Sequence, residues 1–165
     1  MSDSSPTEAI IVELTASILL CTYGGDDPNQ LVSCLESLIS QSRPADEVIL
    51  DCDGPLPGEL EAVVSKYDKT NSVLKTVRCK QNRGLIAALN VGLKHCSCDL
   101  ALRVDSDDLA HEDRIRIQAS YLEQHSEIGV VGTSMLEFES VDISMSRLKP
   151  APHTQLTPRN NCIYL

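Results

Sequence analysis

Short apolar segments alternate with amphipathic segments along most of the chain, and this alternation constrains the fold more than any other feature of the sequence. Strands are expected over residues 16–22, 47–53, 72–77 and 100–105. Helices are expected between and after them, over residues 29–41, 59–67, 85–94 and 112–125. Strands that alternate with helices of this length predict βαβ units with right-handed crossovers. We therefore expect an α/β fold whose mostly parallel sheet is covered by helices on both faces.

The remaining segments set the expected domain boundaries. A chain of 165 residues fits one domain, with residues 1–15 as a flexible N-terminal segment and residues 16–140 as the α/β domain. Residues 128–138 are interpreted as a fifth strand, with a break at Gly132, and residues 141–165 as an irregular tail.

The core is expected to be aliphatic, because hydrophobic residues make up 42% of the chain and aromatic residues only 3%. The apolar spacing predicts that two helices bury one face each. The first helix is expected to bury Leu31, Cys34, Leu35, Leu38 and Ile39. The third is expected to bury Ile86, Leu89 and Leu93.

Net charge and cysteine content narrow the possible partners and the expected location. The formal charge of −10 repels nucleic acids and anionic membranes, so no nucleic acid partner is expected. The seven cysteines and the polar residues 1–8 indicate a reduced, cytoplasmic protein, and peripheral attachment to the inner face of the membrane stays open. No apolar run of about 18 residues occurs, so no transmembrane segment is expected.

An Asp-x-Asp motif follows the strand at residues 100–105. Successive side chains of an extended strand alternate between its faces, so Asp105 and Asp107 are expected to project to the same side. Two carboxylates placed in this way suit Mg²⁺ or Mn²⁺, which prefer oxygen ligands and keep open positions for water and phosphate. Alternatively, Asp107 or Asp108 caps the following helix and the other carboxylates are solvated.

Further polar residues and glycines stand at the expected strand ends, where ligands bind in open α/β sheets. They are Thr22, Tyr23, Asp51, Asp53, Arg83 and Gly84. The Asp53 carboxylate can accept the ring N–H of a pyrimidine, and Thr22 and Tyr23 can border the base. Alternatively, Asp53 and Gly54 form only a turn, and Arg83 is a surface charge.

Five segments together resemble the family 2 glycosyltransferases over roughly residues 15–140. They are Ser17-Ile-Leu-Leu-Cys-Thr-Tyr23, Cys34-Leu-Glu-Ser-Leu-Ile-Ser-Gln41, Glu47-Val-Ile-Leu-Asp-Cys-Asp-Gly54, Asn82-Arg-Gly-Leu85 with Ala88-Leu-Asn90, and Arg103-Val-Asp-Ser-Asp-Asp108. The resemblance implies a Rossmann-like GT-A fold. It also implies transfer of a sugar from a nucleotide diphosphate sugar to an acceptor hydroxyl.

The resemblance also implies roles for individual residues. Thr22, Tyr23 and Asp53 correspond to nucleoside-binding residues, and Arg83 falls in a loop near the nucleotide. Asp105 and Asp107 match the motif that binds the metal and the diphosphate. Arg114 is expected to brace this acidic loop. The catalytic base is expected in a C-terminal acceptor half, before which the chain is apparently truncated; neither Glu137 nor Glu139 is assigned to it.

Two functions therefore stay open. The first is a metal-dependent glycosyltransferase, or its donor-binding half, acting in cell-envelope or polysaccharide synthesis. A UDP-sugar is the first expectation for its donor, and a glycan or a lipid-linked molecule for its acceptor. The second is a catalytically incomplete nucleotide-binding or assembly module that acts through a partner. For both functions, a homo-oligomer or a second chain that completes the domain stays open.

Overall fold

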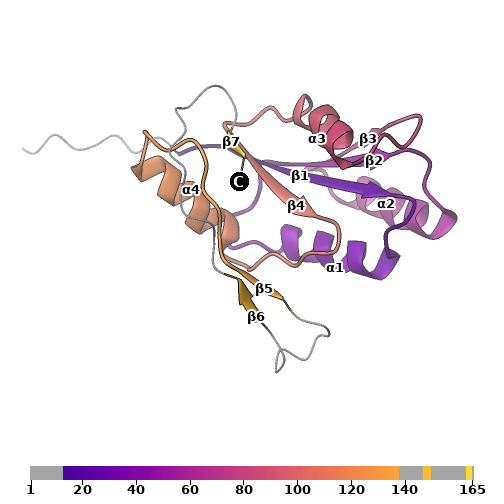
Figure 1. Cartoon of the computed structure of the whole chain (residues 1–165), viewed down its shortest axis with the longest axis horizontal. Helices are drawn as coiled ribbons and strands as arrows, with labels where there is room; N and C mark the ends of the chain where they lie inside the picture. Colours follow the sequence, from indigo (N-terminus) through magenta and orange to yellow (C-terminus); the bar gives the residue numbers. More distant parts are fainter. Residues whose placement is uncertain (1–12, 138–146, 150–162, 165) are drawn as a thin grey trace, which may run out of the picture.

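A parallel sheet with helices on both faces forms the body of the protein (Figure 1). The structure is a computed structural model that describes residues 13–137, 147–149 and 163–164. The strands of the main sheet are β1 (Ala16–Tyr23), β2 (Glu47–Asp53), β3 (Leu74–Arg78), β4 (Leu100–Asp105) and β7 (Ile163–Tyr164). They run parallel in the order β3-β2-β1-β4-β7. The order reverses at β1, which makes the space between β1 and β4 a switch point of the sheet.

Helices connect these strands and bury the sheet. They are α1 (Pro28–Ile39), α2 (Gly58–Thr70), α3 (Leu85–Leu93) and α4 (Arg114–Gln124). The main core lies between one face of the sheet and α1, α2 and α4, and the opposite face of β1 and β2 packs against α3. The α/β fold expected from the sequence is confirmed, and each of the four expected helices forms.

The main core is aliphatic, as the composition predicts. Its largest fully buried side chains are those of leucine and isoleucine, with Ile18 and Leu20 on β1 at its centre. The buried face of α1 is largely as expected, because Leu31, Cys34, Leu35 and Leu38 are buried. Ile39 at the end of that helix is 43% exposed, which the sequence did not predict.

The buried face of α3 differs from the prediction. Ile86 is 78% exposed, whereas Ala88 and Gly92 are buried. Gly92 packs directly against Leu19 of β1, where even a single added carbon would collide with that side chain. Leu89 and Leu93, which were also expected to be buried, are half-buried. Small residues therefore bring α3 close to the sheet, and a pattern based on large apolar residues predicts its buried face only in part.

The fifth strand expected over residues 128–138 is wrong as an element of the main sheet. Residues 128–134 form no strand, although Ile128 is buried in the core. The short strand β5 (Met135–Glu137) pairs antiparallel with β6 (Arg147–Lys149) in a separate sheet. The edge of β4 instead pairs with β7, and both β6 and β7 fall in the segment expected to be irregular. Ile128 and Val131 thus pack against the core from a loop, whereas Val130 is exposed.

Glu47, the first residue of β2, forms a buried polar junction that the sequence did not indicate. Its side chain is 3% exposed. It accepts hydrogen bonds from Ser17 Oγ (2.6 Å), Lys75 Nζ (2.6 Å) and the backbone N–H of Ser97 (2.5 Å). Burial alone would raise the pKa of Glu47, but these hydrogen bonds outweigh it and lower the pKa to about 2. The junction therefore joins β1, β2 and β3 to the turn before β4.

The junction predicts a stability that depends on pH. Because the pKa of Glu47 is lower in the folded than in the unfolded chain, its contribution is present above about pH 4.5 and is lost as the pH falls towards 2. We expect Glu47→Gln to remove about 3 kcal/mol of unfolding free energy at pH 7, and less at pH 3. Urea denaturation at both pH values measures this difference. Glu61→Gln, which alters the exposed pair with Arg78 and a hydrogen bond from the Ser65 hydroxyl, is the control and should cost less than about 1 kcal/mol.

Candidate functional site

A pocket of about 630 Å³ lies at the carboxyl ends of β1, β2 and β4. The two ladders of β1 bring its walls together, because Tyr23 is the register partner of Asp53 and Cys21 is that of Asp105. The lining includes Thr22, Tyr23, Asp53, Gly84, Asp105 and Asp107. The structure thus gathers these sequence-predicted residues around one cavity.

Arg83 contributes to the pocket through its backbone and not through its side chain. Its backbone N–H donates to the carboxylate of Asp53 (3.0 Å). Its guanidinium instead lies 3.8 Å from the Sγ of Cys79, and the side chain is not among those lining the cavity. Cys79 is half-buried.

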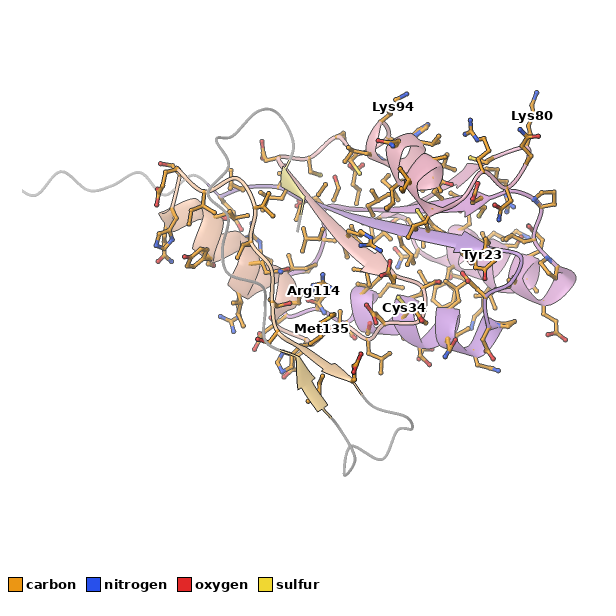
Figure 2. All side chains as sticks on the ribbon, in the orientation of Figure 1. Tyr23, Cys34, Lys80, Lys94, Arg114 and Met135 are labelled. Atoms are coloured by element: carbon orange, nitrogen blue, oxygen red, sulfur yellow. The ribbon has the colours of Figure 1, made fainter. Side chains whose placement is uncertain are left out.

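Thr22 and Tyr23 form the β1 wall of the pocket. The Thr22 side chain is buried, whereas Tyr23 is 49% exposed at the end of the strand (Figure 2). The tyrosine ring lies over Gly25, where a Cβ atom would come within 2.6 Å of it. Glycine at this position therefore lets the ring fold over the loop that follows β1.

Asp53 holds the loop that leads into α3. It is 4% exposed, and its Oδ2 accepts the backbone N–H of Gly84 (2.8 Å) beside the N–H of Arg83. Gly54 lets this loop approach, since it has φ +93° and a Cβ there would lie 2.5 Å from the backbone nitrogen of Asn82. The Asp53-Gly54 pair is thus more than a simple turn, because it fixes the start of α3 at the pocket.

Asp51 lies two residues before Asp53 on β2 but does not line the pocket. Its side chain is fully buried, with Oδ1 3.6 Å from the thiol of Cys79. Its Oδ2 has no hydrogen-bond partner among the described residues, and burial raises the pKa of the carboxyl group. Of the two aspartates at the end of β2, Asp53 therefore lines the pocket and Asp51 does not.

Side chains of α1 and α4 bind the backbone at the end of β4, from which the acidic loop (residues 105–108) begins. Arg114 Nη2 donates to the carbonyl oxygen of Arg103 (2.9 Å), and the Sγ of Cys34 donates to that of Asp105 (3.4 Å) (Figure 2). Arg114 thus braces the strand that carries the acids, as expected. Arg103 Nη2 also forms an ion pair with Asp105 Oδ1 (2.5 Å).

The alternative that Asp107 or Asp108 caps the next helix is wrong. The helix α4 begins at Arg114, and Asp113 stands at its N-cap without a side-chain capping bond. Burial raises the pKa of Asp108, and the adjacent charges of Asp105 and Asp107 raise it further. The three carboxylates therefore repel one another instead of stabilising a helix end.

The exposed carboxylates of this loop fit a hard divalent cation. Asp105 and Asp107 line the pocket, and the Asp105 side chain is 43% exposed. Within the described part of the chain, no group of three histidine, cysteine or acidic side chains could hold a metal alone. A Mg²⁺ or Mn²⁺ ion held by two carboxylates would fill its other positions with water or phosphate oxygens.

Asp26 is a pocket residue that the sequence did not reveal. It lies in the loop between β1 and α1, and its Oδ2 accepts hydrogen bonds from Thr22 and Ser106. The neighbouring Asp27 is recognisable in sequence as the N-cap before Pro28, and it caps α1 by accepting the N–H of Asn29 (2.7 Å). No comparable capping signal marks Asp26, and its contact with Ser106 joins residues 80 positions apart.

The chain belongs to the glycosyl transferase family 2, whose family model matches residues 17–162. An uncharacterized glycosyltransferase of Haemophilus influenzae is 43% identical over 122 residues, covering 74% of this chain and 45% of that protein. The amylovoran biosynthesis glycosyltransferase AmsE of Erwinia amylovora is 36% identical, covering 82% and 50%. The UDP-Gal:alpha-D-GlcNAc-diphosphoundecaprenol beta-1,3-galactosyltransferase of Escherichia coli is 31% identical, covering 84% and 47%. The chain therefore spans about half the length of these curated relatives.

Solved structures have the same fold. The mannosyltransferase PcManGT of Pyrobaculum calidifontis, in complex with GDP-Man and Mn²⁺, matches with a TM-score of 0.66 and 19% identity, covering 80% of this chain and 40% of that one. S. aureus TarS 1-349 in complex with UDP matches with a TM-score of 0.59 and 24% identity, covering 72% and 36%. The fold is thus the Rossmann-like GT-A fold.

Among the described residues, no helix is both long and apolar enough to span a membrane.

The close approach at Gly54 predicts a specific loss of stability. Alanine there would adopt an unfavourable positive φ and collide with backbone atoms of the loop that Asp53 holds. We expect Gly54→Ala to lower the unfolding free energy by about 2 kcal/mol or more. Gly58→Ala is the matched control, because a Cβ there has nothing within 4 Å, and it should change stability by less than about 1 kcal/mol. Equal effects of both substitutions in chemical denaturation would contradict the prediction.

Proposed function

We propose that this domain binds a nucleotide diphosphate sugar together with Mg²⁺ or Mn²⁺, as the donor-binding part of a glycosyltransferase. The observation that carries the proposal is the single cavity lined by Thr22, Tyr23 and Asp53 on one side and by Asp105 and Asp107 on the other. The first group can recognise a nucleoside, and the second can hold a cation beside its diphosphate.

The nucleoside is proposed to lie against β1 and β2. The Asp53 carboxylate accepts two backbone N–H groups, and its remaining lone pairs can accept the ring N–H of a pyrimidine. The exposed ring of Tyr23 offers an apolar surface to the base, and Thr22 borders it. Arg83 is proposed to act near the nucleotide mainly by fixing this loop, because its N–H binds Asp53.

The diphosphate is proposed to lie beside the acidic loop. Asp105 and Asp107 would hold the divalent ion, which neutralises charge developing on the departing diphosphate. Arg103 already offsets part of the Asp105 charge. This leaves the sugar at the mouth of the pocket, open to an acceptor hydroxyl.

The donor and the pathway are proposed from the relatives. UDP is the first choice of nucleotide, because the Escherichia coli relative is named for UDP-Gal and a TarS structure contains UDP. GDP is the second, since the PcManGT structure contains GDP-Man. A role in polysaccharide or cell-envelope synthesis, with a glycan or lipid-linked acceptor, is supported by the names of the Erwinia amylovora and Escherichia coli relatives. The catalytic base is not assigned to any described residue.

Calorimetric titration tests donor binding directly. UDP and GDP are titrated into the chain with Mn²⁺ and then with a chelator. We expect metal-dependent binding of one nucleotide, and a loss of affinity of about tenfold or more in Asp107→Ala because a proposed metal ligand is removed. A folded chain that binds neither nucleotide under either condition would contradict the proposal.

Asp68→Ala is the matched control for this titration. Asp68 is an exposed aspartate whose carboxylate accepts the hydroxyl of Thr76 and which does not line the pocket. Its removal should leave nucleotide affinity unchanged. If both substitutions weakened binding equally, the effect would reflect net charge and not the acidic loop.

A further inference from the structure

One carboxylate oxygen of Asp26 connects two walls of the pocket. Its Oδ2 accepts hydrogen bonds from the Thr22 hydroxyl (2.9 Å), the Tyr23 backbone N–H (3.2 Å) and the Ser106 hydroxyl (2.7 Å). Thr22 and Tyr23 end β1, whereas Ser106 stands between Asp105 and Asp107 after β4. Asp26 thus contacts the proposed nucleoside wall and the proposed metal loop with the same atom.

This bridge stands where the backbone pairing of the strands ends. The parallel ladder between β1 and β4 runs from Ala16 and Leu100 to Cys21 and Asp105. One residue beyond the last pair, the side chains of Thr22 and Ser106 both donate to the Asp26 carboxylate. The carboxylate therefore continues the connection between neighbouring strands after their backbone ladder has stopped.

The bonds are of a kind that can hold the two segments in place. Hydrogen bonds to an ionised carboxylate are stronger than those between neutral groups. The donors to Asp26 also offset the cost of placing its charge in a pocket that already contains Asp105 and Asp107. A loop residue that served only as a surface charge would not need partners from two strands.

We propose that Asp26 is a positioning residue that couples the segment carrying Thr22 and Tyr23 to the loop carrying Asp105 and Asp107. This role rests on the proposed donor site, for which Asp26 would align the metal ligands with the nucleoside wall. It acts through hydrogen-bond acceptance and not as a metal ligand itself. The role therefore requires an oxygen acceptor at the position of Oδ2.

Amide hydrogen exchange tests the coupling without any ligand. The N–H of Asp108 bonds to the carbonyl oxygen of Asp105 and reports on the acidic loop, and the N–H of Tyr23 reports on the end of β1. In Asp26→Ala we expect both amides to exchange about tenfold faster. In Asp26→Asn the amide oxygen can take the place of Oδ2, and exchange should stay within about threefold of wild type.

Two further variants separate the bridge from general effects. Ser106→Ala removes only the contact to the acidic loop, so Asp108 should exchange faster while the Tyr23 amide does not change. Asp68→Ala removes a similar aspartate–hydroxyl contact on the surface and should change neither amide. Unchanged exchange at Asp108 in Asp26→Ala would overturn the coupling, and so would equal effects of Asp26→Asn and Asp26→Ala.

Titration of UDP with Mn²⁺ then relates the coupling to the donor site. Asp26→Ala and Ser106→Ala should weaken the metal-dependent affinity about tenfold, whereas Asp26→Asn should retain it. Full affinity in Asp26→Ala would overturn the positioning role. If the wild-type chain bound no nucleotide, the donor-site proposal would fail, while the exchange data would still decide whether Asp26 couples the two segments.

Discussion

The two parallel ladders of β1 are the constraint on which the pocket depends. β1 lies between β2 and β4, and its register places Tyr23 beside Asp53 and Cys21 beside Asp105. A shift of either ladder by one residue would turn the strand-end side chains to the other face of the sheet. The two faces of β1 pack against different elements, since Ile18 and Leu20 lie in the main core and Leu19 contacts α3, so such a shift would disrupt the packing on both faces. Core packing thus determines which polar side chains meet at the pocket.

Loops then complete the site through backbone contacts that only particular residues permit. The loop before α3 reaches Asp53 because Gly54 leaves room for Asn82. Behind the acidic loop, Arg114 and Cys34 bind backbone oxygens of β4 and its end. These contacts go to backbone oxygens and not to carboxylates, so Asp105 and Asp107 both line the pocket, with Asp105 also paired to Arg103.

The sequence predicted those parts of the fold that depend on local patterns. The alternation of strands and helices, the face of α1 and the gathering of strand-end acids all follow from periodicity and from the geometry of parallel sheets. The errors arose where contacts between distant segments decide the structure. Ile86 is exposed because Gly92 brings α3 against Leu19, and residues 128–134 form no strand although Ile128 is buried in the core. Asp26 was missed for the same reason, since Ser106 lies 80 positions away.

The charges around the pocket favour a cation as a partner of the bound anion. The chain has a net charge of −10, and the pocket that would receive an anionic diphosphate is itself lined by carboxylates. Repulsion from Asp105 and Asp107 raises the pKa of Asp108, in addition to the effect of its burial. Arg103 and Arg114 compensate this charge only in part, and Arg114 is directed to a backbone oxygen. A divalent ion would reverse the local field and let carboxylates and diphosphate share one cavity. This electrostatic argument supports a metal-bound donor independently of the relatives.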